Sequence, residues 1–258
     1  MKITNTQDTQ LTRVKSLVFG DSGIGKTTSL RTLPTDGTVI AIGERGALPL
    51  RELNYQAVIF DDWNDVRQLA GWYLAPDRIE DEATQTMVTG TKQLAIDGLS
   101  EMSAMCCRHI IQVDRKRMLK DRSKGARDTP PGIYEEQMTM DDWGLYRTRM
   151  NSMASVFSHL PIHLVCTCLA AWSKDKVGNE TFRTPALSGK AAFEVPAFFD
   201  EVFFMTSQGE GEANERVWQT FHDGRIIAKD ASGILDRFEP PNWTDVLKKI
   251  LKPANGGN

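Results

Sequence analysis

The chain has 258 residues, of which 40% are hydrophobic and 25% are charged. This composition is ordinary for a folded domain and excludes the collagen-like, disulfide-framework and disordered classes. Lys and Arg number 31 and Asp and Glu 34, which leaves a formal net charge of -3. No general positive field therefore draws the chain to nucleic acid or to a membrane, and any such contact must be local.

The N-terminal residues MKITNTQDTQLTR carry neither an apolar stretch of signal-peptide length nor the many basic residues of a transit peptide. We therefore expect a cytoplasmic protein that makes no membrane contact. The C-terminal residues KPANGGN show no apolar pattern, and we expect them to form a frayed tail.

Short apolar runs alternate with helical patterns along the first two thirds of the chain. The runs predict strands at residues 14–19, 38–42, 57–60, 93–96 and, after Pro161, up to residue 169. The intervening patterns predict helices at residues 26–33, 99–113 and 146–157. Thr139, followed three residues later by Asp142, resembles a capping box and predicts the start of the last of these helices. Strands separated by helices indicate an α/β fold with a mostly parallel sheet flanked by helices.

The pattern changes after residue 200. A strand at 201–205 precedes two runs, 216–221 and 225–229, which flank the turn sequence His222-Asp223-Gly224 and predict an antiparallel hairpin. A last helix begins near Thr244. We expect three parts, which are an N-terminal arm at 1–13, a core at 14–238 that includes the hairpin, and a C-terminal helix with its tail at 239–258.

A complete GxxxxGK[ST] string lies between the first predicted strand and the first predicted helix. That position separates a true P-loop from a chance match, and the alternative is a glycine-rich turn that binds nothing. In a P-loop, backbone N–H groups surround the β-phosphate, a lysine bridges the β- and γ-phosphates, and a hydroxyl ligates Mg²⁺. We therefore assign nucleotide binding to Gly20, Asp21, Ser22, Gly23, Ile24, Gly25, Lys26, Thr27 and Thr28, with Thr27 as a metal ligand.

Two acidic residues complete the predicted site for ATP and Mg²⁺. Asp97 ends a buried strand, as the acid of a Walker-B segment does, and is the second candidate metal ligand. Glu44 follows the second strand and is the candidate that positions the attacking water, so Lys26 and Glu44 are the candidate catalytic residues. The alternatives are a strand-ending aspartate at an ordinary turn and a solvated loop glutamate.

At these residues the chain resembles the RecA/RadA core ATPases, in which a glutamate just past the strand after the P-loop helix activates water. The order of segments continues to match over about residues 14–205, through LAIDGLS, HLVCTCL and TPALSGKAAFEVPAFFDEVFFM. The combination of GDSGIGKTT, DDWGLYRTRM and EPPNWTDVLKKIL is similar to phage-encoded, RecA-core-only ATPases of the single-strand-annealing recombinase group.

This resemblance implies a RecA-like P-loop NTPase fold and ATP hydrolysis stimulated by single-stranded DNA. It also implies assembly into a homo-oligomeric ring or filament on single-stranded DNA, during strand annealing or homologous recombination. A single-stranded-DNA-binding protein is a further expected partner, and a phage protein would act in the host cytoplasm.

The chain departs from the family pattern at two places. RecA-type enzymes usually end the fifth strand with Gln or Asn to sense the γ-phosphate, whereas here Thr167, Cys168 and Leu169 occupy that region. Thr167 is therefore a candidate sensor. The arm before Val14 is short, so the core must provide most of the contact between subunits.

Two basic segments are candidates for DNA contact. Residues 114–128 hold seven basic and three acidic side chains, a local charge of +4. The alternative is a solvated helix face that runs into a loop. The candidate residues of this segment are Lys120, Arg122, Lys124 and Arg127.

The second segment, 170–190, places basic residues near aromatic ones, which suits a single strand whose bases stack on aromatic rings. By resemblance it matches the second DNA-binding loop of the recombinases, and Lys190 is a candidate for reaching the γ-phosphate of a neighbouring subunit. The alternative for Trp172 and Phe182 is a place in the core. The candidate DNA-binding residues are Trp172, Lys174, Lys176 and Arg183.

Two other functions share the P-loop. A small-molecule kinase would transfer phosphate to an acceptor instead of water, and the expected role of Glu44 disfavours it. A nucleotide-gated module with little turnover would use the basic segments to bind a protein partner.

Overall fold

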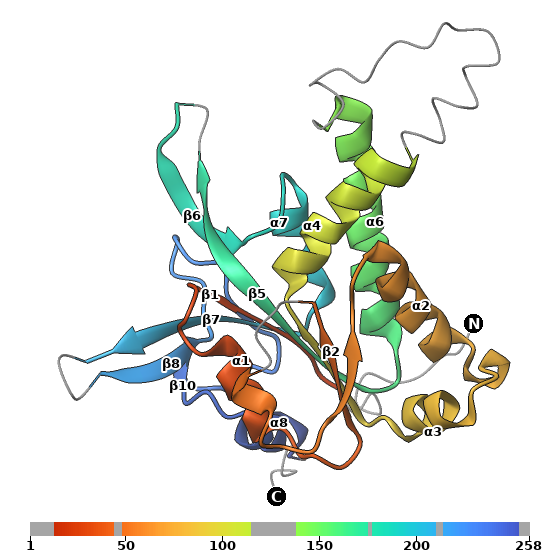
Figure 1. The fold of residues 1–258 in the computed structure, drawn as a ribbon. Helices are drawn as coiled ribbons and strands as arrows, with labels where there is room; N and C mark the ends of the chain where they lie inside the picture. Colours follow the sequence, from red (N-terminus) through yellow and green to blue (C-terminus); the bar gives the residue numbers. More distant parts are fainter. Residues whose placement is uncertain (1–12, 44–47, 115–137, 175–176, 210–213, 253–258) are drawn as a thin grey trace, which may run out of the picture.

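The computed structural model describes residues 13–43, 48–114, 138–174, 177–209 and 214–252. Their strands form one ten-stranded sheet in the order β10-β8-β7-β1-β5-β4-β2-β3, with β6 paired to β5 and β9 paired to β7 (Figure 1). The strands are β1 (Lys15–Gly20), β2 (Thr38–Ile42), β3 (Gln56–Ile59), β4 (Gln93–Asp97), β5 (His163–Lys174), β6 (Glu180–Pro185), β7 (Glu201–Gln208), β8 (Glu215–Gln219), β9 (Lys229–Asp230) and β10 (Phe238–Glu239).

The centre of the sheet is parallel, as the alternation of strands and helices predicts. β1 lies between β5 and β7, and β4 separates β5 from β2. Antiparallel pairing appears where β8 joins β7 and β10 joins β8. The α/β fold class, with a mostly parallel sheet and antiparallel strands toward the C-terminus, is confirmed.

Helices cover both faces of the sheet (Figure 1). The α1 and α8 helices cover one face, and α2, α4 and α6 cover the other, with α3 beside α2 and α7 beside α6. The helices are α1 (Lys26–Ser29), α2 (Trp63–Leu74), α3 (Glu82–Gly90), α4 (Leu99–His109), α6 (Met140–His159), α7 (Ala191–Glu194) and α8 (Trp243–Leu251), and short 3-10 turns occur at η2 (Leu30–Thr32), η3 (Leu48–Leu50), η4 (Pro76–Arg78) and η7 (Val195–Phe198).

Alternating side chains of the central strands fill the two layers. In β1, Leu17 and Phe19 pack under α2, α4 and α6, while Val18 packs under α1 and α8. Because both faces are covered, these strands read as continuous apolar runs. The predicted start of α6 is also confirmed, since Thr139 and Asp142 form a capping box.

The β5 strand continues beyond the sheet as one arm of a hairpin. Its residues up to Leu169 pair with β1, and from Ala170 onward it pairs antiparallel with β6. Figure 1 shows this β5–β6 hairpin projecting away from the carboxyl ends of the central strands. Residues 170–185, expected as a basic loop, are therefore mostly strand.

The predicted pairing of residues 216–221 with 225–229 is wrong. β8 pairs instead with β7 on one edge and with β10 on the other, so neither edge is left for the following segment. The turn itself exists, because the Asp223 carboxylate accepts hydrogen bonds of 2.8 Å from the N–H groups of Arg225 and Ile226.

Within the described residues, every helix is too short or too polar to cross a bilayer.

Candidate nucleotide-binding site

The P-loop leaves the sheet at the carboxyl end of β1 and leads into α1. Gly20 is required by a close approach, because a Cβ there would lie 2.7 Å from the Met205 carbonyl oxygen of β7. The backbone of Gly25 has a φ angle of 108°, in the left-handed region that favours glycine. Between them Asp21, Ser22 and Gly23 are exposed, so the loop opens to solvent.

The side chain of Lys26 folds back over the loop. Its Nζ donates hydrogen bonds to the carbonyl oxygens of Gly20 at 3.0 Å and Asp21 at 2.8 Å. Lys26 is buried. The two carbonyl groups hold its ammonium group at the place where the P-loop motif puts the β- and γ-phosphates.

Thr27 and Asp97 meet beside the P-loop, as predicted for the two metal ligands. The Thr27 hydroxyl donates to Asp97 Oδ2 at 2.9 Å, with Oδ1 at 3.2 Å. The Thr167 hydroxyl, at the carboxyl end of the sheet part of β5, donates to Asp97 Oδ1 at 2.5 Å and accepts from the Gly98 N–H at 3.1 Å. Two hydroxyl groups from different elements therefore orient one buried carboxylate.

The candidate water-positioning residue, Glu44, lies outside the described residues. Its predecessor Gly43 donates its N–H to the Asp97 carbonyl oxygen at 2.9 Å. The described end of β2 therefore lies directly beside the end of β4, at the same edge of the sheet as the P-loop.

Arg183 of β6 also reaches the P-loop. Its guanidinium forms an ion pair with the Asp21 carboxylate and stacks near two rings, with the Trp172 centroid at 5.0 Å and the Phe204 centroid at 5.4 Å. Its side chain is only 12% exposed. The sequence marked Arg183 as a residue of a DNA loop, and nothing in the linear pattern indicates that it contacts the P-loop.

Arg216 of β8 is a P-loop neighbour that the sequence pattern missed. A Cβ added to Gly25 would lie 2.6 Å from its Nη1 atom, so the guanidinium covers the loop at that glycine. β8 reaches this place because it pairs with β7, which in turn lies beside β1. With Lys26 and Arg183, three cationic side chains from three elements surround one exposed loop, and this favours a polyanionic ligand.

The donor set suits ATP and Mg²⁺. A hydroxyl and a carboxylate are the oxygen ligands that Mg²⁺ takes together with substrate phosphates, so Thr27 and Asp97 are the residues that would hold it. The described residues contain no cluster of three or more His, Cys, Asp or Glu that could hold a metal. A P-loop metal needs no such cluster, because the phosphates complete its shell.

The other predicted residues lie in several places. On the hairpin, Trp172 is 40% exposed and Lys174 is exposed. Lys190 is exposed directly before α7, while Thr28 is exposed in α1. The candidates that fall outside the described residues are Lys120, Arg122, Lys124, Arg127 and Lys176.

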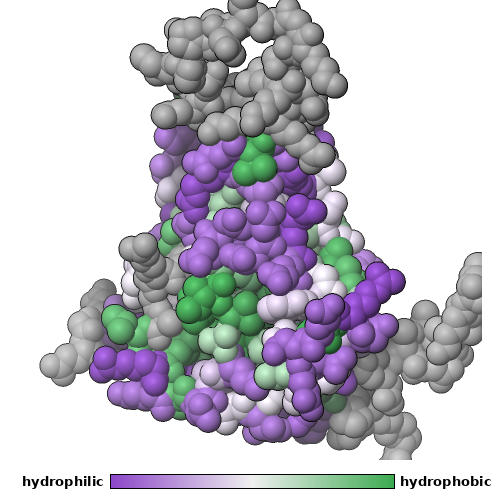
Figure 2. All heavy atoms as spheres, turned by 45° about the vertical axis from the view of Figure 1, so that its right-hand side comes forward, coloured by the Kyte–Doolittle hydropathy of each residue, from purple (hydrophilic) through white to green (hydrophobic). Residues whose placement is uncertain are grey.

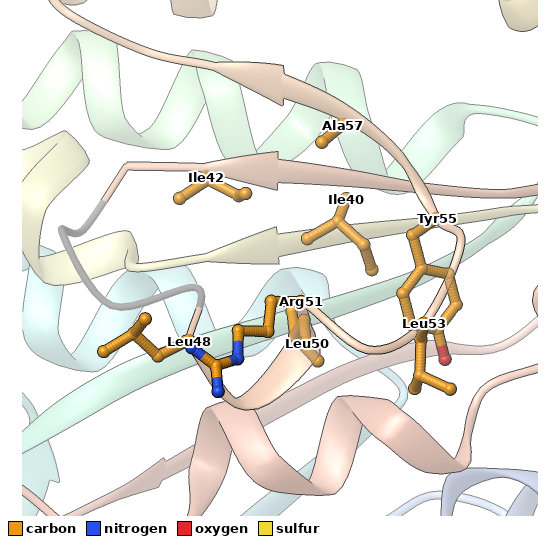
Figure 3. Close-up of a pocket in the computed structure, with 8 residues that line it drawn as sticks. All are labelled: Ile40, Ile42, Leu48, Leu50, Arg51, Leu53, Tyr55 and Ala57. Atoms are coloured by element: carbon orange, nitrogen blue, oxygen red, sulfur yellow. The ribbon is translucent and has the colours of Figure 1, made fainter.

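Apolar side chains gather on part of the surface and around one cavity. The face drawn in Figure 2 is mostly hydrophilic, with apolar side chains concentrated near its centre. A cavity of about 400 Å³ lies between β2, the start of β3 and η3, where Ile40 and Ile42 face Leu50 (Figure 3). Tyr55, whose pKa is raised by burial, closes one end and donates its hydroxyl to the Leu33 carbonyl oxygen at 2.8 Å. This largely apolar lining does not suit phosphates, although η3, which forms one wall, contacts α1, the helix that follows the P-loop.

Of the comparisons with known proteins, the family match is the one that identifies the chain. Among solved structures, the chain is similar to a KaiC-like protein from the hyperthermophilic archaeon Pyrococcus horikoshii OT3, with 12% identity and a TM-score of 0.42 over 84% of this chain and 82% of that chain. No curated protein matches the sequence. The profile of a family described as an AAA domain matches residues 12–232. Because that match spans most of the chain, the protein belongs to this family, AAA_24, of AAA-type P-loop ATPase domains.

Proposed function

We propose that this P-loop ATPase hydrolyses ATP with Mg²⁺ and uses the reaction to control its hold on single-stranded DNA. The setting would be phage-type homologous recombination or strand annealing, in the host cytoplasm. The observation that carries the ATPase part is the contact of Thr27 with Asp97, which brings the two expected metal ligands together beside the P-loop.

Each residue of the site has one part in hydrolysis. Lys26 offsets negative charge on the transferring phosphoryl group, and the loop N–H groups hold the phosphate chain. Thr27 and Asp97 would hold Mg²⁺, which would supply positive charge to offset the negative charge of the phosphates. Thr167 keeps the Asp97 carboxylate oriented, and Glu44, which follows Gly43 in the chain and lies outside the described residues, is the proposed residue that positions the attacking water.

The β5–β6 hairpin is the proposed DNA contact. It projects from the edge of the sheet where the P-loop opens and carries an exposed tryptophan beside an exposed lysine, Trp172 and Lys174. A base stacked on an aromatic side chain contributes about 1–3 kcal/mol, and a lysine contacts the phosphate backbone. Lys176 and the basic residues of segment 114–128 are further proposed DNA contacts; Lys176 and residues 115–128 lie outside the described residues.

Assembly completes the proposal. We infer a homo-oligomeric ring or filament on DNA, in which the exposed Lys190 reaches the nucleotide of a neighbouring subunit. A single-stranded-DNA-binding protein is the further proposed partner, because it would occupy the same DNA.

Equilibrium binding to a fluorescent single strand tests the DNA half. Anisotropy is measured without nucleotide, with ADP and with a non-hydrolysable ATP analogue, for the wild type and for Lys174→Glu. We expect affinity that depends on the nucleotide, and a weaker, less salt-dependent affinity in the variant. Lys248→Glu, on α8 with a side chain 74% exposed, is the charge-matched control and should bind as the wild type does.

The outcomes separate the proposal from its rivals. Affinity for single strands that ignores the nucleotide would falsify the DNA half. Transfer of phosphate to a small acceptor would indicate a kinase, and nucleotide-gated binding of a protein without turnover would indicate a binding module.

A further inference from the structure

Arg183 connects the P-loop to the β5–β6 hairpin. One side of its guanidinium forms the ion pair with Asp21, the second residue of the P-loop motif. The same group lies 5.0 Å from the ring centroid of Trp172, the exposed aromatic residue of the hairpin. A single side chain thus contacts both the proposed phosphate site and the proposed DNA surface.

The backbone of Arg183 is firmly placed. Arg183 lies directly opposite Trp172 in the antiparallel register of β5 and β6. Its N–H donates to the Arg225 carbonyl oxygen at 2.6 Å, and its own carbonyl oxygen accepts from the Ile227 N–H at 3.2 Å. Phe204 of β7 supports the guanidinium from the core side at 5.4 Å. Its position therefore depends on fixed strands, while its partner Asp21 lies on a loop.

The two ends of the ion pair differ in exposure. The Arg183 side chain is 12% exposed and the Asp21 side chain 66%. Strand pairing fixes the backbone of Arg183, whereas the exposed Asp21 carboxylate lies where charge arriving at the loop acts on it directly. A triphosphate bound to the P-loop would place negative charge beside Asp21 and change its attraction for Arg183.

The other candidate for sensing the nucleotide is Thr167, and its hydroxyl is already bonded to Asp97 and to the Gly98 N–H. Thr167 thus contacts the metal-ligand carboxylate, and the hairpin side chain that contacts the loop is Arg183.

We propose that Arg183 is a positioning residue that transmits the nucleotide state of the P-loop to the β5–β6 hairpin, through its ion pair with Asp21 and its contact with Trp172. The proposal rests on the proposed function where it concerns DNA. Charge arriving at the P-loop weakens the ion pair with Asp21, and the guanidinium that Asp21 no longer holds changes its contact with Trp172 and hence the affinity of the hairpin for a strand.

The first test measures coupling. The ratio of single-strand dissociation constants, with and without a non-hydrolysable ATP analogue, is determined for the wild type, Arg183→Gln, Arg183→Lys and Asp21→Asn. Coupled sites typically give ratios of about 5–150. We expect a ratio within about twofold of one for Arg183→Gln and for Asp21→Asn. The double variant should lose no more of this coupling than either single variant does.

Two control variants distinguish a loss of coupling from a general disturbance of the structure. Arg183→Lys keeps the charge but not the planar group, so it should retain part of the ratio. Arg147→Gln removes another arginine of an ion pair, the one that joins α6 to Glu194 of α7, and should leave the ratio unchanged. An unchanged ratio in both Arg183→Gln and Asp21→Asn overturns the proposal.

The second test needs no DNA. The contribution of Trp172 to fluorescence, taken as the difference between the wild type and Trp172→Phe, is followed while the ATP analogue is added, with nucleotide binding measured separately by calorimetry. We expect a nucleotide-dependent change that Arg183→Gln abolishes. A wild type that binds nucleotide with no change at Trp172 overturns this inference alone, whereas a change at Trp172 without DNA binding contradicts the DNA half of the proposed function.

Discussion

The Thr27 hydroxyl donates a hydrogen bond to the Asp97 carboxylate across 2.9 Å, although 70 positions separate the two residues in the chain. They meet because β1 and β4 run parallel on either side of β5, so that their carboxyl ends open to the same edge of the sheet. A hydroxyl and a carboxylate are oxygen ligands of the kind that Mg²⁺ takes together with phosphates, which is why we propose these two residues as its ligands.

Thr27→Ala should lower the rate of ATP hydrolysis by at least about tenfold, or roughly 1.4 kcal/mol of barrier, because it removes one of the metal ligands. Thr27→Ser keeps the hydroxyl and should retain most of the activity. Phosphate release measured over a series of magnesium concentrations checks this. Equal rates of ATP hydrolysis for Thr27→Ala and Thr27→Ser would show that the hydroxyl has no part in the reaction.

Thr167→Val should raise the magnesium concentration needed for half-maximal turnover more than it lowers the maximal rate. The change deletes a hydroxyl that orients Asp97 and leaves the Gly98 N–H without its partner, at a cost of about 1–3 kcal/mol in unfolding free energy. Magnesium titration combined with denaturant unfolding separates the two effects. Thr167→Ser is the matched control, and a Val variant with the magnesium response of the wild type would contradict the orienting role.

Glu44→Gln should bind ATP as tightly as the wild type but lose at least about tenfold in turnover, because the amide cannot accept the proton of the attacking water. Calorimetric binding and single-turnover hydrolysis, measured on the same preparation, test the two halves. Undiminished hydrolysis would leave the water-positioning role to another residue.

Much of this site could be predicted because its parts are local in the sequence. Residues 20–27 form one continuous string, and Asp97 is recognised as the acid that ends a buried run. The rule that ligands bind beyond the carboxyl ends of parallel strands then places Asp97 near the P-loop without knowledge of the structure.

The contribution of the two arginines could not be predicted, because it depends on which strands pair. The alternation of side-chain character over residues 216–221 is compatible with pairing to several different strands. Pairing with β7 lets Trp218 stack on Phe203 with ring centroids 5.2 Å apart, and it also brings Arg216 to the P-loop. Arg183 likewise reaches Asp21 only because β5 continues past the sheet into a hairpin.

Arg216→Ala should weaken the binding of ATP more than that of adenosine, because the guanidinium covers the phosphate-binding loop at Gly25. We expect a loss of about fivefold or more in ATP affinity, the range of a charge-assisted contact. Arg67→Ala removes an exposed arginine from α2, on the opposite face of the sheet, and serves as the control. Identical nucleotide affinities in the two variants would show that Arg216 does not contact the phosphates.

Glu201 gives a prediction on stability. Burial, with the nearby Asp230 carboxylate, raises the pKa of Glu201 to about 8, well above its ordinary value of 4.5. The folded state therefore binds a proton that the unfolded state has released, and this stabilisation is complete below about pH 4.5 and is lost as the pH rises through about 8.

Glu201→Gln cannot titrate, so the wild type should lose unfolding free energy relative to the variant as the pH rises from about 4.5 to about 8. Urea unfolding at several pH values across this range measures the difference. Parallel stability curves for the two proteins would contradict the raised pKa.

The most direct test of ATP hydrolysis at this P-loop is steady-state phosphate release from ATP in the presence of magnesium, with and without single-stranded DNA. The wild-type protein is compared with Lys26→Ala. We predict release by the wild type that single strands accelerate, and release near background for the lysine variant under both conditions. Magnesium-independent release, or equal release by the two proteins, would contradict an ATPase site at this P-loop, and release indifferent to DNA would contradict its coupling to single strands.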